Sequence, residues 1–119
     1  MSEAPPEHTV DDHFAGKPPA VREVYDRLLT TLRTLGPVQE EPKKTSIHLV
    51  RSSALAGVEV RRDYLFVNIK SSSPIESPRV TKPERLSARR FHQKVKLSSS
   101  AEVDAELRRW LADAYELSG

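Results

Sequence analysis

The chain has 119 residues, no cysteine and a formal net charge of +2, and its length is typical of one domain. The absence of cysteine excludes disulfides, thiolate metal sites and cysteine nucleophiles. No apolar segment approaches the roughly 20 residues of a membrane-spanning helix, and the polar, acidic start of the chain is unlike a secretory signal. We therefore expect a cytoplasmic protein without a membrane partner.

The first residues are predicted to form a disordered tail. Residues 1–9 contain two prolines and two glutamates and offer little apolar surface to bury. Residues 10–119 are expected to form a single domain. Its first element is predicted to be one helical turn from Val10 to Phe14, with Phe14 as the anchor.

A long amphipathic helix is predicted from Pro19 to Leu35, where apolar residues recur at spacings of three, four and seven. Proline is tolerated in a first helical turn because its missing N–H would have no partner there. Gly36 and Pro37 are predicted to end the helix. Gly36 is expected to adopt the left-handed cap conformation, and a proline cannot continue the helix.

The middle of the chain is predicted to form strands. Residues 47–50, 54–60, 64–70 and 91–97 are rich in β-branched and aromatic residues or alternate apolar with polar ones. Residues 75–90 contain two prolines, so any strand there is expected at a sheet edge.

A second helix is predicted near the C-terminus. Ser99 and Glu102 match a capping box, and an apolar stripe follows up to Leu117. Trp110 lies on this stripe and is expected in the core. The order of helix, strands and helix predicts an α+β fold: an antiparallel sheet of about five strands with an N-terminal and a C-terminal helix packed on one face.

Five segments share their residues with one known family: 8–19 (HTVDDHFAGKPP), 35–38 (LGPV), 44–49 (KTSIHL), 63–69 (DYLFVNI) and 101–117. They resemble a bacterial family of small domains of unknown function, sometimes labelled predicted transport proteins. The resemblance covers residues 8–117 and implies no activity, cofactor or catalytic residue. The layout is also remotely similar to YdhG-like and YjbR-like domains, in which helices flank an antiparallel sheet. DNA binding has been suggested for some of those domains.

Positive charge is concentrated in the middle of the chain. Residues 43–96 contain thirteen Lys or Arg and four Asp or Glu, a net charge of +9, which leaves −7 for the remainder. Such asymmetry concerns partners rather than fold. Alternation predicts that Leu65, Val67 and Ile69 face the helices. The opposite face then combines aromatic with basic side chains: His48, Tyr64, Phe66, Asn68, Lys70, His92, Lys94 and Lys96.

Rings that stack bases, interleaved with cations that neutralise phosphates, suit single-stranded nucleic acid. An anionic partner such as nucleic acid is therefore the leading hypothesis. The candidate residues are three basic doublets and four sheet residues: Lys43, Lys44, Arg61, Arg62, Arg89, Arg90, Tyr64, Phe66, His92 and Lys94. The doublets would form an anion pocket if their strand ends converge. The alternatives are a small anionic metabolite, or an interface with another protein or a second copy of the chain.

No catalytic or metal-binding pattern stands out. His8 and His13 lie near acidic residues, but their spacing matches no zinc motif. The chain has four glycines and no phosphate-binding loop, and neither serine cluster lies in a nucleophile elbow. His48 and His92 could form an acid/base pair if their strands are neighbours. We expect a binding or accessory domain without a cofactor, and an enzyme is left open.

Overall fold

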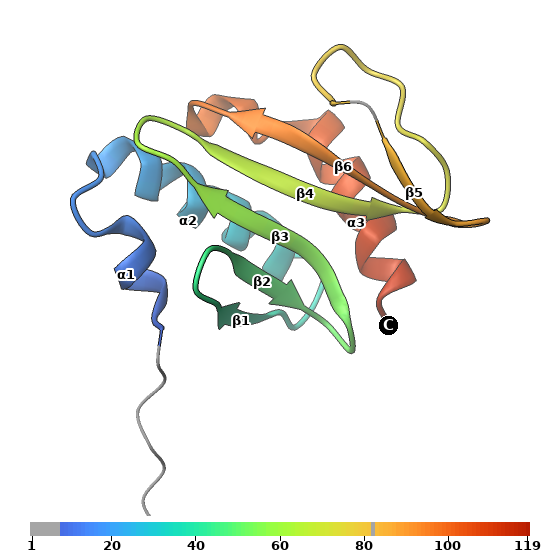
Figure 1. Cartoon of the computed structure of the whole chain (residues 1–119), viewed down its shortest axis with the longest axis horizontal. Coiled ribbons are helices and arrows are strands. Elements are labelled where there is room, and N and C mark those ends of the chain that lie inside the picture. The colour runs from blue at the N-terminus through green and yellow to red at the C-terminus, as the bar shows by residue number, and fades with distance from the viewer. Residues whose placement is uncertain (1–7, 82) are drawn as a thin grey trace, which may run out of the picture.

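A single antiparallel sheet forms the centre of the protein, with both long helices on one of its faces (Figure 1). The computed structural model describes residues 8–81 and 83–119. Its elements, in chain order, are α1 (Val10–Phe14), α2 (Pro19–Arg33), β1 (Gln39–Pro42), β2 (Ile47–Val50), β3 (Ala54–Val60), β4 (Leu65–Ser71), β5 (Glu84–Ser87), β6 (Arg90–Leu97), the 3-10 turn η1 (Ser100–Glu102) and α3 (Ala105–Leu117).

The strand order is β1-β2-β3-β4-β6-β5, and every neighbouring pair is antiparallel. This arrangement confirms the predicted α+β fold, with six strands instead of about five. The strand predicted at an edge within residues 75–90 is β5. The additional strand is β1, which has a polar sequence without β-branched residues and lies at the opposite edge.

The short helix α1 forms as predicted. Its N-terminus is closed by a capping box between Thr9 and Asp12, and Phe14 is buried at its end. The centre of the Phe14 ring lies 5.2 Å from that of Tyr25 on α2 and 5.0 Å from the Arg22 guanidinium. Residues 1–7 of the predicted tail lie outside the described residues.

Helix α2 begins at Pro19 as predicted and ends at Arg33, two residues before the expected end. The prediction for Gly36 was wrong in its conformation. Its φ is +151°, far from the left-handed helical region. A Cβ atom at Gly36 would collide with the hydroxyl of Tyr115, which donates a hydrogen bond to the Pro37 carbonyl at 3.2 Å. Glycine is required here by a tertiary contact rather than by the helix end.

The core lies between the sheet and helices α2 and α3. Leu65, Val67 and Ile69 alternate along β4 and are fully buried on the helix side, which confirms the predicted faces of this strand. Burying each such side chain stabilises the fold by roughly 1.5–3 kcal/mol. Gln93 on β6 is a buried polar exception. Its amide nitrogen donates to the Ile69 carbonyl at 2.7 Å, which satisfies it inside the core.

The capping box of Ser99 and Glu102 exists, but it closes η1 rather than the long helix. The prediction of a single helix from this box was wrong because Val103 has a non-helical backbone with ψ of 78°. Helix α3 therefore starts anew at Ala105, with the Asp104 carboxylate accepting from the Leu107 amide at 3.1 Å. Trp110 is only partly buried, against the edge of the core. Within the described residues, no helix has the length and apolar character needed to cross a membrane.

Candidate binding face of the sheet

The face of the sheet opposite α2 and α3, here called the open face, carries no helix in the described part of the chain (Figure 1). Helix α1 packs through Phe14 onto α2, and the segment after β4 packs through Arg79 onto α3. Neither covers Tyr64 or Phe66, and both rings are half-buried among their neighbours on the sheet. The open face is therefore available to a partner.

All the side chains of strand β6 that point to the open face belong to basic residues. Its outward positions are every second residue and form what we call the basic column: Arg90, His92, Lys94 and Lys96. The column extends over about 20 Å, at about 3.3 Å per residue. It runs beside β4, where Lys96 is paired with Phe66, Lys94 with Asn68 and His92 with Lys70. Basic and aromatic side chains thus line two adjacent strands.

Two rings and their cations form an aromatic cluster at the end of the open face nearest the β3–β4 turn. Tyr64 and Phe66 pack edge to face, with ring centroids 5.4 Å apart. The Lys96 ammonium lies 4.3 Å from the Tyr64 ring centre. Arg61 and Lys94 lie 5.8 and 5.7 Å from the Phe66 ring centre.

A carboxylate sits within this cluster. Glu59 on β3 is the strand partner of Phe66 and accepts from Arg61 at 2.9 Å and from Lys94 at 3.0 Å. It neutralises part of the local positive charge. The candidate residues predicted from the sequence did not include Glu59. Its position can be inferred from alternation, because Glu59 lies between the apolar residues Val58 and Val60 in β3 and therefore points to the opposite face.

The three basic doublets do not converge. Residues 43–44 lie in the β1–β2 turn and residues 61–62 in the β3–β4 turn, at the same end of the sheet. Residues 89–90 lie at the β5–β6 turn, at the opposite end. The antiparallel strand order enforces this separation. Of the ten candidates, the structure gathers Arg61, Tyr64, Phe66 and Lys94 in the aromatic cluster. Arg90 and His92 continue the basic column, whereas Lys43, Lys44, Arg62 and Arg89 lie in turns.

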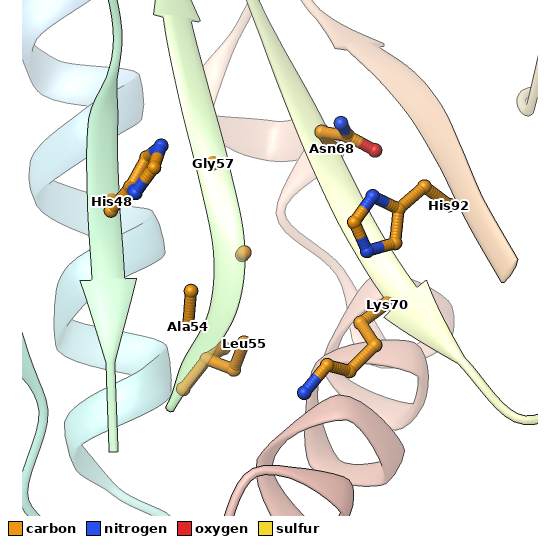
Figure 2. Close-up of a pocket in the computed structure, with 8 residues that line it drawn as sticks. His48, Ala54, Leu55, Gly57, Asn68, Lys70 and His92 are labelled. Atoms are coloured by element: carbon orange, nitrogen blue, oxygen red, sulfur yellow. The ribbon is translucent and has the colours of Figure 1, made fainter. Parts of the chain in front are cut away.

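A depression of about 120 Å³ lies at the other end of the open face (Figure 2). Its lining comes from four adjacent strands: His48, Ala54, Leu55, Ala56, Gly57, Asn68, Lys70 and His92. Gly57 is paired with His48 on one side and Asn68 on the other, and its lack of a side chain leaves the middle of the depression clear. The predicted His48–His92 pair on neighbouring strands is excluded, because β3 and β4 lie between β2 and β6.

Polar groups in the depression are incompletely paired. The Lys70 ammonium donates only to the hydroxyls of Ser118 at 3.2 Å and Ser53 at 3.4 Å among the described residues. Burial lowers the pKa of Lys70, and the nearby Arg90 lowers it further. The buried side-chain oxygen of Asn68 has no hydrogen-bond partner within residues 8–81 and 83–119. Such unsatisfied groups are uncommon in native structures and often mark sites for water, ions or ligands.

The electrostatics of His92 combine three influences. Burial lowers the pKa of its imidazole, the carboxylate of Glu84 on β5 raises it, and the Lys70 ammonium lowers it again. The net effect is a pKa below the usual value of 6.5. His92 is therefore mainly neutral at pH 7 and offers one N–H donor.

The family described as Domain of unknown function (DUF5655) matches residues 10–118, nearly the whole chain. The chain belongs to this family. No curated protein and no solved structure matches it. The predicted resemblance to a family of domains of unknown function is thereby confirmed. Because a DUF5655 domain carries no described activity, the function of this one is argued from its open face.

Proposed function

We propose that the open face binds single-stranded nucleic acid, with the phosphates along the basic column and bases against the aromatic cluster. The observation that carries this proposal is the basic column itself. Each outward position of β6 holds a basic residue, and the column runs beside Tyr64 and Phe66. Sheet surfaces that bind single strands combine cations along the backbone path with rings that stack bases.

A sheet face favours a single strand over a duplex. Duplex DNA is read by an element that enters a groove, whereas the open face is a sheet surface that carries no helix in the described part of the chain. The rings of the aromatic cluster are already in contact with cations of the chain, which a bound strand must displace. Those contacts are weak, because Arg61 and Lys94 are 47% and 40% exposed and a cation–π contact at an exposed site contributes only about 0.5–1 kcal/mol.

The test is fluorescence anisotropy with labelled DNA and RNA single strands of about ten nucleotides. We expect binding that weakens steeply as salt rises from about 50 to about 200 mM, since bound phosphates release counterions. A duplex of the same sequence should bind less tightly than the single strand. Absence of binding at low salt by the folded protein would contradict the proposal.

Two lysine variants distinguish the open face from general positive charge. Lys96→Met removes one charge from the basic column and its contact with Tyr64. Lys17→Met removes the same charge from the loop between α1 and α2. We expect the first to weaken binding several-fold, on the order of 1 kcal/mol, and the second to leave it nearly unchanged. Equal losses from the two variants would show that binding is not confined to the open face.

A further inference from the structure

The depression at the far end of the open face is distinct from the aromatic cluster and shares one residue, His92, with the basic column. Three basic side chains from three strands line the depression: His48 from β2, Lys70 from β4 and His92 from β6. Figure 2 shows the His48 imidazole between β2 and β3 and the His92 imidazole over β4, each leaning inward from its own strand.

Acidic residues lie around the depression rather than in it. None of the described residues that line it is acidic. Glu41 on β1 is paired with His48, Glu84 on β5 is paired with His92, and Glu59 lies further along β3, beside the aromatic cluster. Each imidazole therefore has a carboxylate on its outer side and the depression on its inner side.

The size of the depression restricts its ligand. Pockets for drug-sized molecules have volumes of about 300–1,000 Å³, and a water occupies about 30 Å³. A volume of about 120 Å³ therefore suits a group of about five heavy atoms. The alanine and leucine side chains at one end of the lining give it an apolar wall. A charge beside such a wall is screened less than in water.

We propose that the depression binds one phosphoryl group, as inorganic phosphate or as the terminal phosphate of a larger molecule, with Lys70 and His92, which are paired across β4 and β6, as its donors and His48 on the opposite wall. Among the described residues, the ammonium of Lys70 donates to two serine hydroxyls, at 3.2 and 3.4 Å, and it can exchange them for a phosphate oxygen. A bound dianion also offsets the burial that lowers the pKa of His92. This inference does not depend on the proposed nucleic-acid function.

The test is a titration of the folded protein with inorganic phosphate at constant ionic strength, followed by NMR of the histidine side chains. We expect saturable shifts of the His48 and His92 imidazoles that fit one dissociation constant. His13 lies on α1 and serves as an internal control whose shifts should be small. No saturable shift at His48 and His92, or equal shifts at His13, would overturn the proposal.

Two substitutions in the depression test whether phosphate binds there. Lys70→Met should weaken phosphate binding by about tenfold or more, because it removes a charged donor, whereas Lys17→Met should not change it. Gly57→Ala adds a methyl group in the middle of the depression. That methyl group would lie in ordinary contact, 3.9 Å from the His48 ring, so the fold is retained while space is lost. We expect several-fold weaker binding. Phosphate affinity unchanged in both Lys70→Met and Gly57→Ala would overturn the assignment.

A final experiment identifies the molecule that supplies the phosphoryl group. It also distinguishes phosphate binding in the depression from strand binding along the basic column. Single strands with a 5′-phosphate are compared with strands carrying a 5′-hydroxyl. Tighter binding of the phosphorylated strand, lost in Lys70→Met, assigns the depression to a strand end. Phosphate binding without this preference assigns it to a free anion or small phosphomonoester. Replacing Tyr64 and Phe66 by alanine should abolish strand binding and leave inorganic phosphate binding intact, so the two proposals fail separately.

Discussion

At Gly36 the backbone passes beneath the hydroxyl of Tyr115, and no side chain fits between them. The Gly36→Ala substitution forces either the ring or the backbone to move, at a φ of +151° that L residues rarely adopt. We expect the free energy of unfolding to fall by about 2 kcal/mol or more, measured by urea denaturation.

A double-mutant cycle makes this prediction specific. Tyr115→Phe removes the colliding hydroxyl and its hydrogen bond to Pro37, which should cost only about 1 kcal/mol. If the collision is the cause, Gly36→Ala should cost less in the Tyr115→Phe background than in the unchanged protein. Equal costs in both backgrounds would show that backbone strain alone accounts for the loss.

The conformation of Gly36 shows which features of single residues the sequence could not predict. The Gly-Pro pair correctly indicated that a helix ends, because that signal is local. It could not indicate why glycine is needed, since the contact is with Tyr115, which lies far along the chain in α3. Asn68 is similar: alternation placed it on the open face, but only the packed sheet shows that its side-chain oxygen is buried without a partner.

At the scale of elements, Arg79 fastens the segment between β4 and β5 to the start of α3. Its guanidinium donates to the carboxylates of Asp104 and Glu106 at 3.0 Å and to the Glu102 carbonyl at 2.7 Å. It also lies 5.7 Å from the centre of the Trp110 ring. Arg79 belongs to the basic stretch of the sequence, yet its charge is used on the helix side of the sheet.

We expect Arg79→Ala to lower the free energy of unfolding by about 1–2 kcal/mol, a moderate value because both carboxylates are partly exposed. Hydrogen exchange should accelerate at the Thr81 amide, which donates to the Lys94 carbonyl, and should remain slow within β3 and β4. Arg85→Ala on the exposed edge strand β5 is the matched control and should change neither quantity. Unchanged exchange at Thr81 in Arg79→Ala would contradict the anchoring role.

The elements that the sequence predicted are those with a local pattern. The stripe of α2 and the alternation of β4 and β6 are visible within about ten residues of chain. Strand β1 has no such pattern and is held by tertiary contacts: its ladder with β2, and the Tyr25 hydroxyl, which donates to Glu40 at 2.6 Å. Burial and this hydrogen bond to a carboxylate raise the pKa of Tyr25. Such contacts cannot be inferred from four polar residues.

At the scale of the whole molecule, the fold divides the basic stretch among three places. Part of the charge lines the open face, part lies in the turns at both ends, and Arg51 and Arg79 contact α3. Alternation predicted the first group, because residue parity fixes the face of a strand. It could not predict that the doublets separate, nor that Glu41 and Glu84 flank the depression. Both depend on the strand order, in which β6 lies between β4 and β5.

The net charge of the open face should therefore control its affinity for nucleic acid, and Glu59 offers the sharpest test. Its carboxylate is held between Arg61 and Lys94, where it competes with any phosphate for both cations. Glu59→Gln keeps the shape and removes the charge. We expect single-stranded oligonucleotides to bind about three- to fivefold more tightly at low salt, equivalent to somewhat less than 1 kcal/mol. The dependence of affinity on salt should also become steeper.

The matched control is Glu23→Gln, which removes the same charge from an exposed position on α2, on the helix side of the molecule. Its effect should be small, because salt screens interactions between exposed charges that lie more than about 10 Å apart. If both variants tighten binding equally, overall charge determines the affinity and the open face has no special role. If Glu59→Gln weakens binding, Glu59 positions Lys94 and Arg61 for the strand and does not compete with it. Tighter binding in Glu59→Gln alone would place the nucleic-acid backbone between β3 and β6, where the basic column meets the aromatic cluster.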